Sequence, residues 1–163
     1  DIAKDHPDTV ATWVREHRTG AHPAREALLR HASRTLVKQG HAPTLAAWDL
    51  TPGLHGRAAL ALSDTLVRVG DSLGLQARLR STSAQAQTLV VDYAVHHQRA
   101  NGGTSAKVFK GWKLALPAGA EVALDKRHSL REVTTRRLYP GLHRVDLQVN
   151  GAVVATAAFE LRA

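Results

Sequence analysis

The segment from residue 125 to residue 145 concentrates side chains that could hold phosphate groups. It reads DKRHSLREVTTRRLYPGLHRV and carries six Lys and Arg residues, with small hydroxyls between them. Arginine forks and hydroxyl groups are the usual ligands of phosphate oxygens. The residues that we assign to a nucleic-acid-binding site here are Arg127, His128, Ser129, Arg131, Thr134, Thr135, Arg136 and Arg137. The sequence alone leaves one alternative equally open, a solvated cationic loop that contacts nothing.

The excess positive charge of the chain is concentrated around this segment. The chain has a formal net charge of +8, and residues 104–145 carry nine Lys and Arg against three Asp and Glu. Such local clustering is what a binding face produces. Lys107 and Lys110, on a neighbouring predicted strand, are assigned to the same phosphate-binding patch. For these lysines the alternative is protection of an edge strand against aggregation.

The elements that must position these side chains are strands, because residues 58–163 alternate apolar and polar positions. About seven such strands follow one another, and Asn150-Gly151 is a strong hairpin signal. This spacing predicts an antiparallel immunoglobulin-like β-sandwich. We expect a β-bulge at Gly111. The link over residues 128–141 is longer than most connections, which favours a functional loop.

Residues 1–50 have helical periodicity instead. Pro7 and Pro23 stand at helix-start positions, and Gly40 follows the second helix. The apolar positions that we expect to form the main buried face of the second helix are Ala24, Leu28, Ala32 and Leu36, with Leu29 and Val37 on a second face. Short helices without a core of their own suggest the end of a helical repeat array. Residues 51–57, rich in Gly and Pro, are the predicted linker.

Composition excludes several classes of protein. The chain has no Cys, so disulfides and zinc–thiolate sites are impossible. It has no apolar run of membrane-spanning length. The absence of Cys and of a signal peptide together favours the cytoplasm. Because it starts at Asp1 and has no Met, we expect a fragment of a longer protein. The ten His residues are scattered, and His96-His97 point to opposite strand faces, which argues against a metal site.

Two other residue types receive structural roles. His143 stands where sandwiches place a corner residue that hydrogen-bonds to the backbone. The tryptophans Trp13, Trp48 and Trp112 are assigned to packing in the core or between domains rather than to base stacking.

Several stretches resemble a known family. KVFKGWKLAL, KRHSLREVTTRRLYPGLHRVDLQVNG, the closing AAFEL and the helix LLRHASRTLVKQG are similar to the C-terminal part of bacterial AlkC-type DNA alkylation repair glycosylases. The resemblance implies the last helices of a HEAT-like repeat superhelix, followed by an immunoglobulin-like domain. It also implies an N-glycosylase that releases cationic alkylated bases, such as 3-methyladenine or 3-methylcytosine, from double-stranded DNA without a metal or cofactor.

The resemblance places acidic catalytic side chains on the concave face of the repeats, where a carboxylate stabilises an oxocarbenium-like centre. Asp1 is the catalytic candidate in this chain. The alternative is that Asp1 is only a helix-end residue that truncation has exposed. We therefore expect a monomer that clamps DNA but releases no base alone. The rival function is a structural or protein-interaction sandwich that caps the helical array. Sugar or peptide binding has only the generic fold in its favour.

Overall fold

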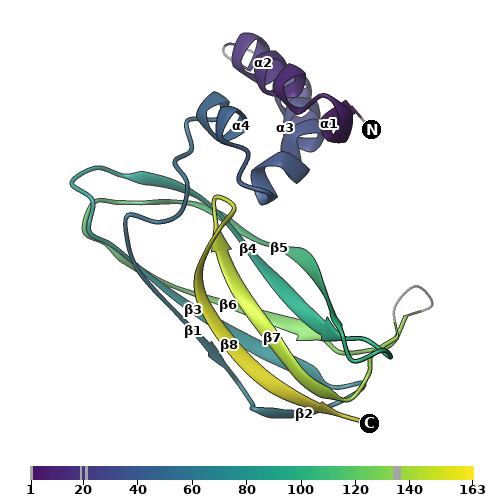
Figure 1. The fold of residues 1–163 in the computed structure, drawn as a ribbon. Coiled ribbons are helices and arrows are strands. Elements are labelled where there is room, and N and C mark those ends of the chain that lie inside the picture. Colours follow the sequence, from purple (N-terminus) through teal and green to yellow (C-terminus); the bar gives the residue numbers. More distant parts are fainter. Residues whose placement is uncertain (1, 19, 21, 134–136) are drawn as a thin grey trace.

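The computed structural model describes residues 2–18, 20, 22–133 and 137–163. Its helices are α1 (Ile2–Asp5), α2 (Pro7–His17), α3 (Pro23–Lys38) and α4 (Ala42–Ala47). Its strands are β1 (Gly56–Leu62), β2 (Leu66–Arg68), β3 (Ser72–Ser81), β4 (Gln87–Gln98), β5 (Thr104–Leu116), β6 (Glu121–Ser129), β7 (Gly141–Val149) and β8 (Ala152–Arg162). The helices form a group above the strands, and the chain crosses once from one part to the other (Figure 1).

The helices follow their proline and glycine signals. α2 and α3 each begin with a proline, and α3 ends before Gly40, whose φ of +70° suits a residue without a side chain. The predicted buried face of α3 is wrong in part, because Leu28 is 66% exposed and the buried side is formed by Leu29, Ser33, Leu36 and Val37. Among the described residues, no helix is both long and apolar enough to cross a membrane.

The strands form the predicted immunoglobulin-like sandwich. One sheet has the order β1-β3-β6 and the other the order β2-β8-β7-β4-β5. All pairs are antiparallel except β2 with β8. The described chain has one strand more than the estimate of about seven. The strand that the sequence did not reveal is β1, which is rich in alanine and lies at an edge.

The sandwich core has two adjoining parts. Around Phe159 lie Leu73, Tyr93, Val145 and the loop residue Leu130, all nearly or fully buried. The second part, nearer the helices, contains Leu79, Leu89, Leu116 and Leu147. Because the chain has no Cys, the two sheets are held together by this packing.

The bulge predicted at Gly111 is confirmed. Val91 pairs with Trp112 and Asp92 pairs with Lys110, so Gly111 is the extra residue of β5. The backbone of β4 approaches it closely, and an added Cβ would lie 2.4 Å from the carbonyl oxygen of Val91. A side chain at this position therefore requires the two strands to separate.

We expect Gly111→Ala to destabilise the chain by about 1–3 kcal/mol, the usual cost of overpacking. The free energy of unfolding, measured by urea titration, gives the result directly. An unchanged unfolding midpoint would show that β5 can move away from β4 at little cost.

His143 has the predicted corner role. Its side chain is 1% exposed, its ring stacks on Phe159 at 5.3 Å, and its Nε2–H donates to the carbonyl oxygen of Tyr139 at 2.9 Å. Burial lowers the pKa of His143 below its ordinary value of 6.5, and the hydrogen bond to Tyr139 opposes that shift only in part. The folded protein therefore favours the neutral imidazole.

This lowered pKa predicts a stability that falls in mild acid. Below pH 6.5 the unfolded chain binds a proton at His143 that the folded chain does not yet bind, so stability is lost as the pH falls toward the lowered pKa. One proton contributes at most about 1.4 kcal/mol per pH unit. Between pH 7 and pH 5, the free energy of unfolding should fall less with decreasing pH for His143→Gln than for the parent. Parallel curves would assign the pH dependence to other groups.

The helices rest on the sandwich through the tip of the β7–β8 hairpin and the outer face of β4. The hairpin tip points at the end of α3 (Figure 1), where the Gly151 carbonyl oxygen lies 3.4 Å from the position of a Cβ on Gly40. The predicted Asn150-Gly151 hairpin is confirmed, with φ values of +48° and +81°. Asn150 also donates to the carbonyl oxygen of Thr51 at 2.7 Å and accepts from the backbone N–H of Val90 at 2.8 Å. The same residue therefore forms the turn and attaches the linker to the sheet.

Candidate nucleic-acid interface

The cationic loop lies between β6 and β7 and is held at both ends by buried leucines. β6 continues to Ser129 and β7 begins at Gly141, so the connection is shorter than the sequence predicted. Leu130 is fully buried and Leu138 is 3% exposed, and both belong to the core around Phe159. The Leu138 backbone N–H lies 3.4 Å from the Glu132 carboxylate, which accepts its hydrogen bond. The loop therefore starts and ends at fixed points of the core.

The described cations of this segment project to the surface. Arg127, Arg131 and Arg137 are exposed, as is Ser129. The Ser129 hydroxyl oxygen accepts a 3.3 Å hydrogen bond from the backbone N–H of Arg131, and the Arg137 guanidinium lies 5.7 Å from the centre of the Tyr139 ring. No described carboxylate forms an ion pair with these three arginines. They are available to an anionic ligand.

His128 is not at the surface. It is 5% exposed, and its Nδ1 lies 3.1 Å from the Tyr93 hydroxyl. Its ring also contacts the rings of Tyr93 and Phe109 edge to face. The strand alternation that exposes Arg127 and Ser129 turns His128 into the core, so it has a packing role and is not available to DNA in this structure.

Four of the assigned residues cannot be placed. Thr134, Thr135 and Arg136 of the loop, and Asp1, the catalytic candidate, lie outside the described residues.

The structure separates the two lysines that the sequence grouped with the loop. Lys107 pairs with the buried Val95, and its ammonium lies 5.3 Å from the Phe109 ring centre. Lys110 pairs with Asp92, which faces the helices. Because neighbouring positions in a strand alternate between faces, Lys107 and Lys110 lie on opposite faces of β5. Lys110 belongs to a different surface, between β5 and α3.

That second cationic surface is the feature that sequence reasoning missed. A cleft of about 370 Å³ between α3 and β5 is lined by Arg30 and Arg34 from the helix and by Lys110 and Lys113 from the strand. The spacing of Arg30 and Arg34 on one side of α3 was visible in the sequence. Their position opposite the lysines depends on how the helices pack on the sandwich, which no local pattern encodes.

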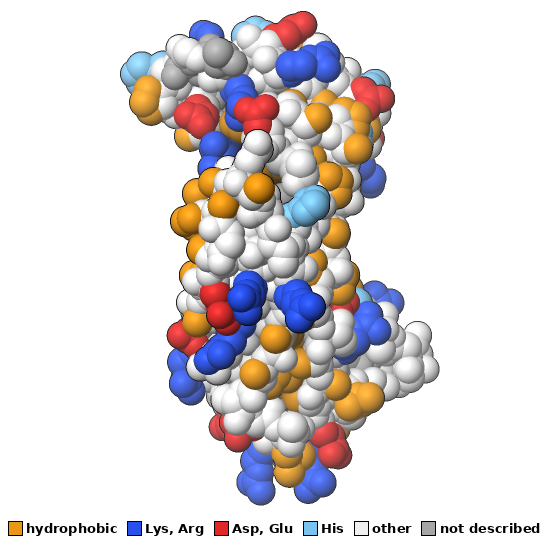
Figure 2. All heavy atoms as spheres, turned by 90° about the vertical axis from the view of Figure 1, so that its left-hand side faces the viewer, with side chains coloured by type: hydrophobic (Ala, Val, Ile, Leu, Met, Phe, Trp, Pro, Cys, Tyr) orange, Lys and Arg blue, Asp and Glu red, His pale blue; other side chains and the backbone are white. Residues whose placement is uncertain are grey.

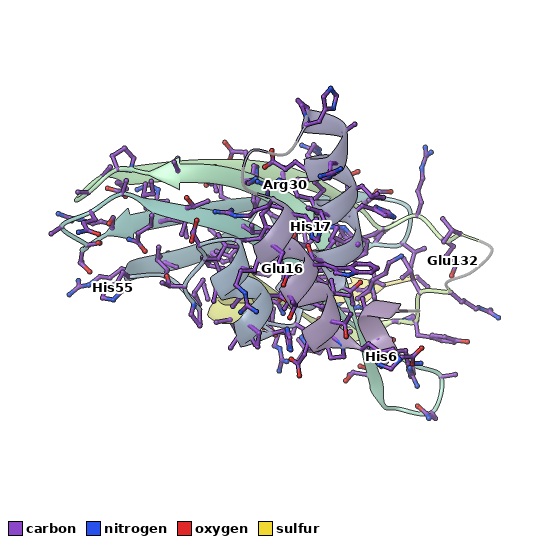
Figure 3. All side chains as sticks on the ribbon, turned by 90° about the horizontal axis from the view of Figure 1, so that it is seen from above. His6, Glu16, His17, Arg30, His55 and Glu132 are labelled. Carbon is purple, nitrogen blue, oxygen red and sulfur yellow. The ribbon has the colours of Figure 1, made fainter. Side chains whose placement is uncertain are left out.

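The loop and the cleft are different places on the molecule. Viewed from above, Glu132 of the loop lies at one end of the sandwich and His55 of the linker at the other, with Arg30 between them (Figure 3). On the face seen in Figure 2, lysine and arginine side chains occur both on the helices and on the sandwich. The positive charge is therefore not confined to the loop.

A third polar cluster lies on the outer face of β4 and β7. His96 Nε2 is 2.8 Å from the Asp146 carboxylate, and the Thr156 hydroxyl donates to Asp146 at 2.8 Å. Burial opposes ionisation of Asp146, but these hydrogen bonds and the charge of Arg144 outweigh it and lower its pKa. The cluster is a structural ion-pair network. Across the described parts of the chain, no three His, Asp or Glu side chains come together as a metal site would require.

The chain is similar to a DNA glycosylase of known structure and to an uncharacterized bacterial protein. An alkylpurine DNA glycosylase, AlkC of Pseudomonas fluorescens, solved bound to DNA containing an abasic site analog, is 35% identical, with a TM-score of 0.89 over 100% of this chain and 45% of its own. The uncharacterized protein YhaZ of Bacillus subtilis is 27% identical over 99% of this chain and 44% of its own length. The chain therefore spans less than half the length of these relatives.

Solved structures with lower sequence identity are similar to this chain in fold alone. A β-glucosidase of Listeria innocua is 19% identical and has a TM-score of 0.53 over 67% of this chain. The family described as "Uncharacterised protein YhaZ, C-terminal Ig-like domain" matches residues 57–163, which include almost all of β1 and every later strand. The chain belongs to this family of YhaZ C-terminal Ig-like domains.

Proposed function

We propose that this chain is the C-terminal part of a DNA alkylation repair glycosylase and that its sandwich grips the DNA backbone. The observation that carries the proposal is the likeness to the DNA-bound AlkC structure, which extends over the helices as well as the sandwich. In this proposal the excised bases are small and cationic, such as 3-methyladenine or 3-methylcytosine. The helices α1 to α4 are the end of a HEAT-like repeat array.

The local chemistry of the loop supports a role in backbone contact. Arg127 near the end of β6, and Arg131 and Arg137 on the loop fixed by Leu130 and Leu138, are exposed cations without described acidic partners. Guanidinium groups bind phosphate oxygens in two-pronged geometry, and such contacts supply affinity without reading sequence. The sandwich thus increases residence on the duplex, and base release depends on acidic residues of the repeat array.

A titration of short duplex DNA by fluorescence anisotropy tests the proposal. Binding should be weak, independent of sequence and steeply dependent on salt. With four to six phosphates engaged, log affinity should fall against log salt concentration with a slope of about −4 to −5. A chain that binds no duplex at low salt, or binds it without salt dependence, would contradict the proposal.

A capping role for the sandwich is the second candidate. Its support is the contact between the hairpin tip and the end of α3, together with Val90, which packs on the apolar cluster of the helices. In that case deletion of residues 57–163 should reduce stability and solubility, while charge reversal at Arg131 and Arg137 should leave DNA affinity unchanged. The two roles are compatible, and only the second measurement separates them.

A further inference from the structure

The cleft between α3 and β5 combines positive charge with apolar walls. Its volume of about 370 Å³ is in the range of small-molecule sites. Arg30 and Arg34 line it from the helix, Lys110 and Lys113 from the strand, and Val37, Trp48, Leu50 and Val90 supply its apolar wall. Apolar walls lower the local dielectric and strengthen the attraction between these cations and any anion that enters.

The charges inside the cleft do not balance. Asp92 is the one carboxylate among the described residues lining it, and it is already engaged by Arg34 at 3.3 Å. Arg30 reaches Glu26 at 2.9 Å, but both of these side chains are about two-fifths exposed. Neither Lys110 nor Lys113 forms an ion pair with a described acidic residue. The cleft therefore holds an excess of positive charge near its apolar wall.

The structure also holds these cations close to one another. The Arg30 guanidinium lies over the Trp48 ring at 4.3 Å, and that of Arg18 lies near the same ring at 5.4 Å. Partial burial lowers the pKa of Lys113, and the charge of Arg30 lowers it further, while the carboxylate of Glu26 opposes the shift only in part. An anion between Arg30 and Lys113 would offset both the repulsion and the loss of hydration.

We propose that this cleft binds a phosphate group of the DNA backbone, held between Arg30 of α3 and Lys113 of β5. The Arg30 fork donates to two phosphate oxygens, and the Lys113 ammonium acts as a point charge. The inference rests on the proposed function and adds a second contact, separate from the loop. Because its two cations come from different parts of the chain, a phosphate bound there fixes the sandwich relative to the helices.

Tryptophan fluorescence with duplex DNA tests this site in the whole chain. A Trp13→Phe background removes the exposed tryptophan of α2, so the emission comes from Trp48, which lies under the Arg30 guanidinium, and from Trp112 of the sandwich. Duplex DNA should shift or quench the emission in this background. Arg30→Gln/Lys113→Gln should lose most of that change and make the salt slope less steep by about 1, the share of one phosphate. Lys113→Arg, which keeps the charge, should retain the response, and thermal unfolding checks that each variant is folded.

Three results would overturn the inference, and they differ from failure of the proposed function. If the double variant binds duplex with the parent's affinity and salt slope, the cleft holds no backbone phosphate, although the chain still binds DNA. If inorganic pyrophosphate alone changes the emission and duplex does not, the occupant is a free phosphate compound. If the parent binds no duplex in the anisotropy titration, the proposed function and this inference fail together.

Discussion

Arg34→Met should lower the free energy of unfolding by about 2–3 kcal/mol, although the position lies outside the sandwich core. The reason is the carboxylate that it leaves behind. The Asp92 side chain is 3% exposed, and it forms an ion pair with Arg34 at 3.3 Å. The backbone N–H of Gly111 adds only a long hydrogen bond of 3.4 Å. Without Arg34, a buried negative charge is insufficiently compensated.

The exposed pair of Arg162 and Glu160 is the matched control. Both side chains are more than half exposed and 3.6 Å apart, so Arg162→Met should change stability by about 0.5 kcal/mol or less. Asp92→Asn combined with Arg34→Met should recover part of the loss, because the double variant buries no charge. Urea unfolding of the four proteins completes the comparison. Equal effects of Arg34→Met and Arg162→Met would show that the Asp92–Arg34 contact does not stabilise the docking of helices on sandwich.

Local sequence signals predicted the helices and strands of this fold more accurately than they predicted which side of each element is buried. Asn150-Gly151 and Gly111 indicated the hairpin and the bulge, because both structures need a backbone geometry that few residues tolerate. β1 was missed because GRAALAL has small residues and an edge position, so no strong alternation marks it. Leu28 was assigned to the wrong side of α3, because repeated apolar positions fit two helix faces and only the packing chooses between them.

For the candidate site too, some features were visible in the sequence and others depend on tertiary packing. The charge density of the loop was visible in the sequence, and Arg131 and Arg137 are exposed as expected. His128 was assigned to the loop over residues 128–141, but β6 continues to Ser129, and its alternation turns His128 into the core. The cleft could not be predicted from the sequence, because Arg30 and Lys113 are far apart in the chain and come together only when the helices dock on the sheet.

The second large effect concerns the loop. Arg131→Gln combined with Arg137→Gln should weaken duplex binding about tenfold at low salt, the result of losing two exposed charge-assisted contacts. Both side chains are exposed, so the variant should keep the parent's stability. Arg78→Gln with Arg80→Gln removes the same charge from exposed positions of β3, at the opposite end of its pairing with β6 from the loop, and serves as the control.

The salt dependence of duplex binding by these three proteins tests the central claim, that the loop between β6 and β7 contacts the DNA backbone. The slope of log affinity against log salt concentration should be less steep by about 2 for the loop variant, because each lost phosphate contact removes about 0.9. The β3 variant should keep the slope of the parent. Equal slopes for the loop and β3 variants would contradict the claim, since the effect would then come from net charge and not from contact by the loop.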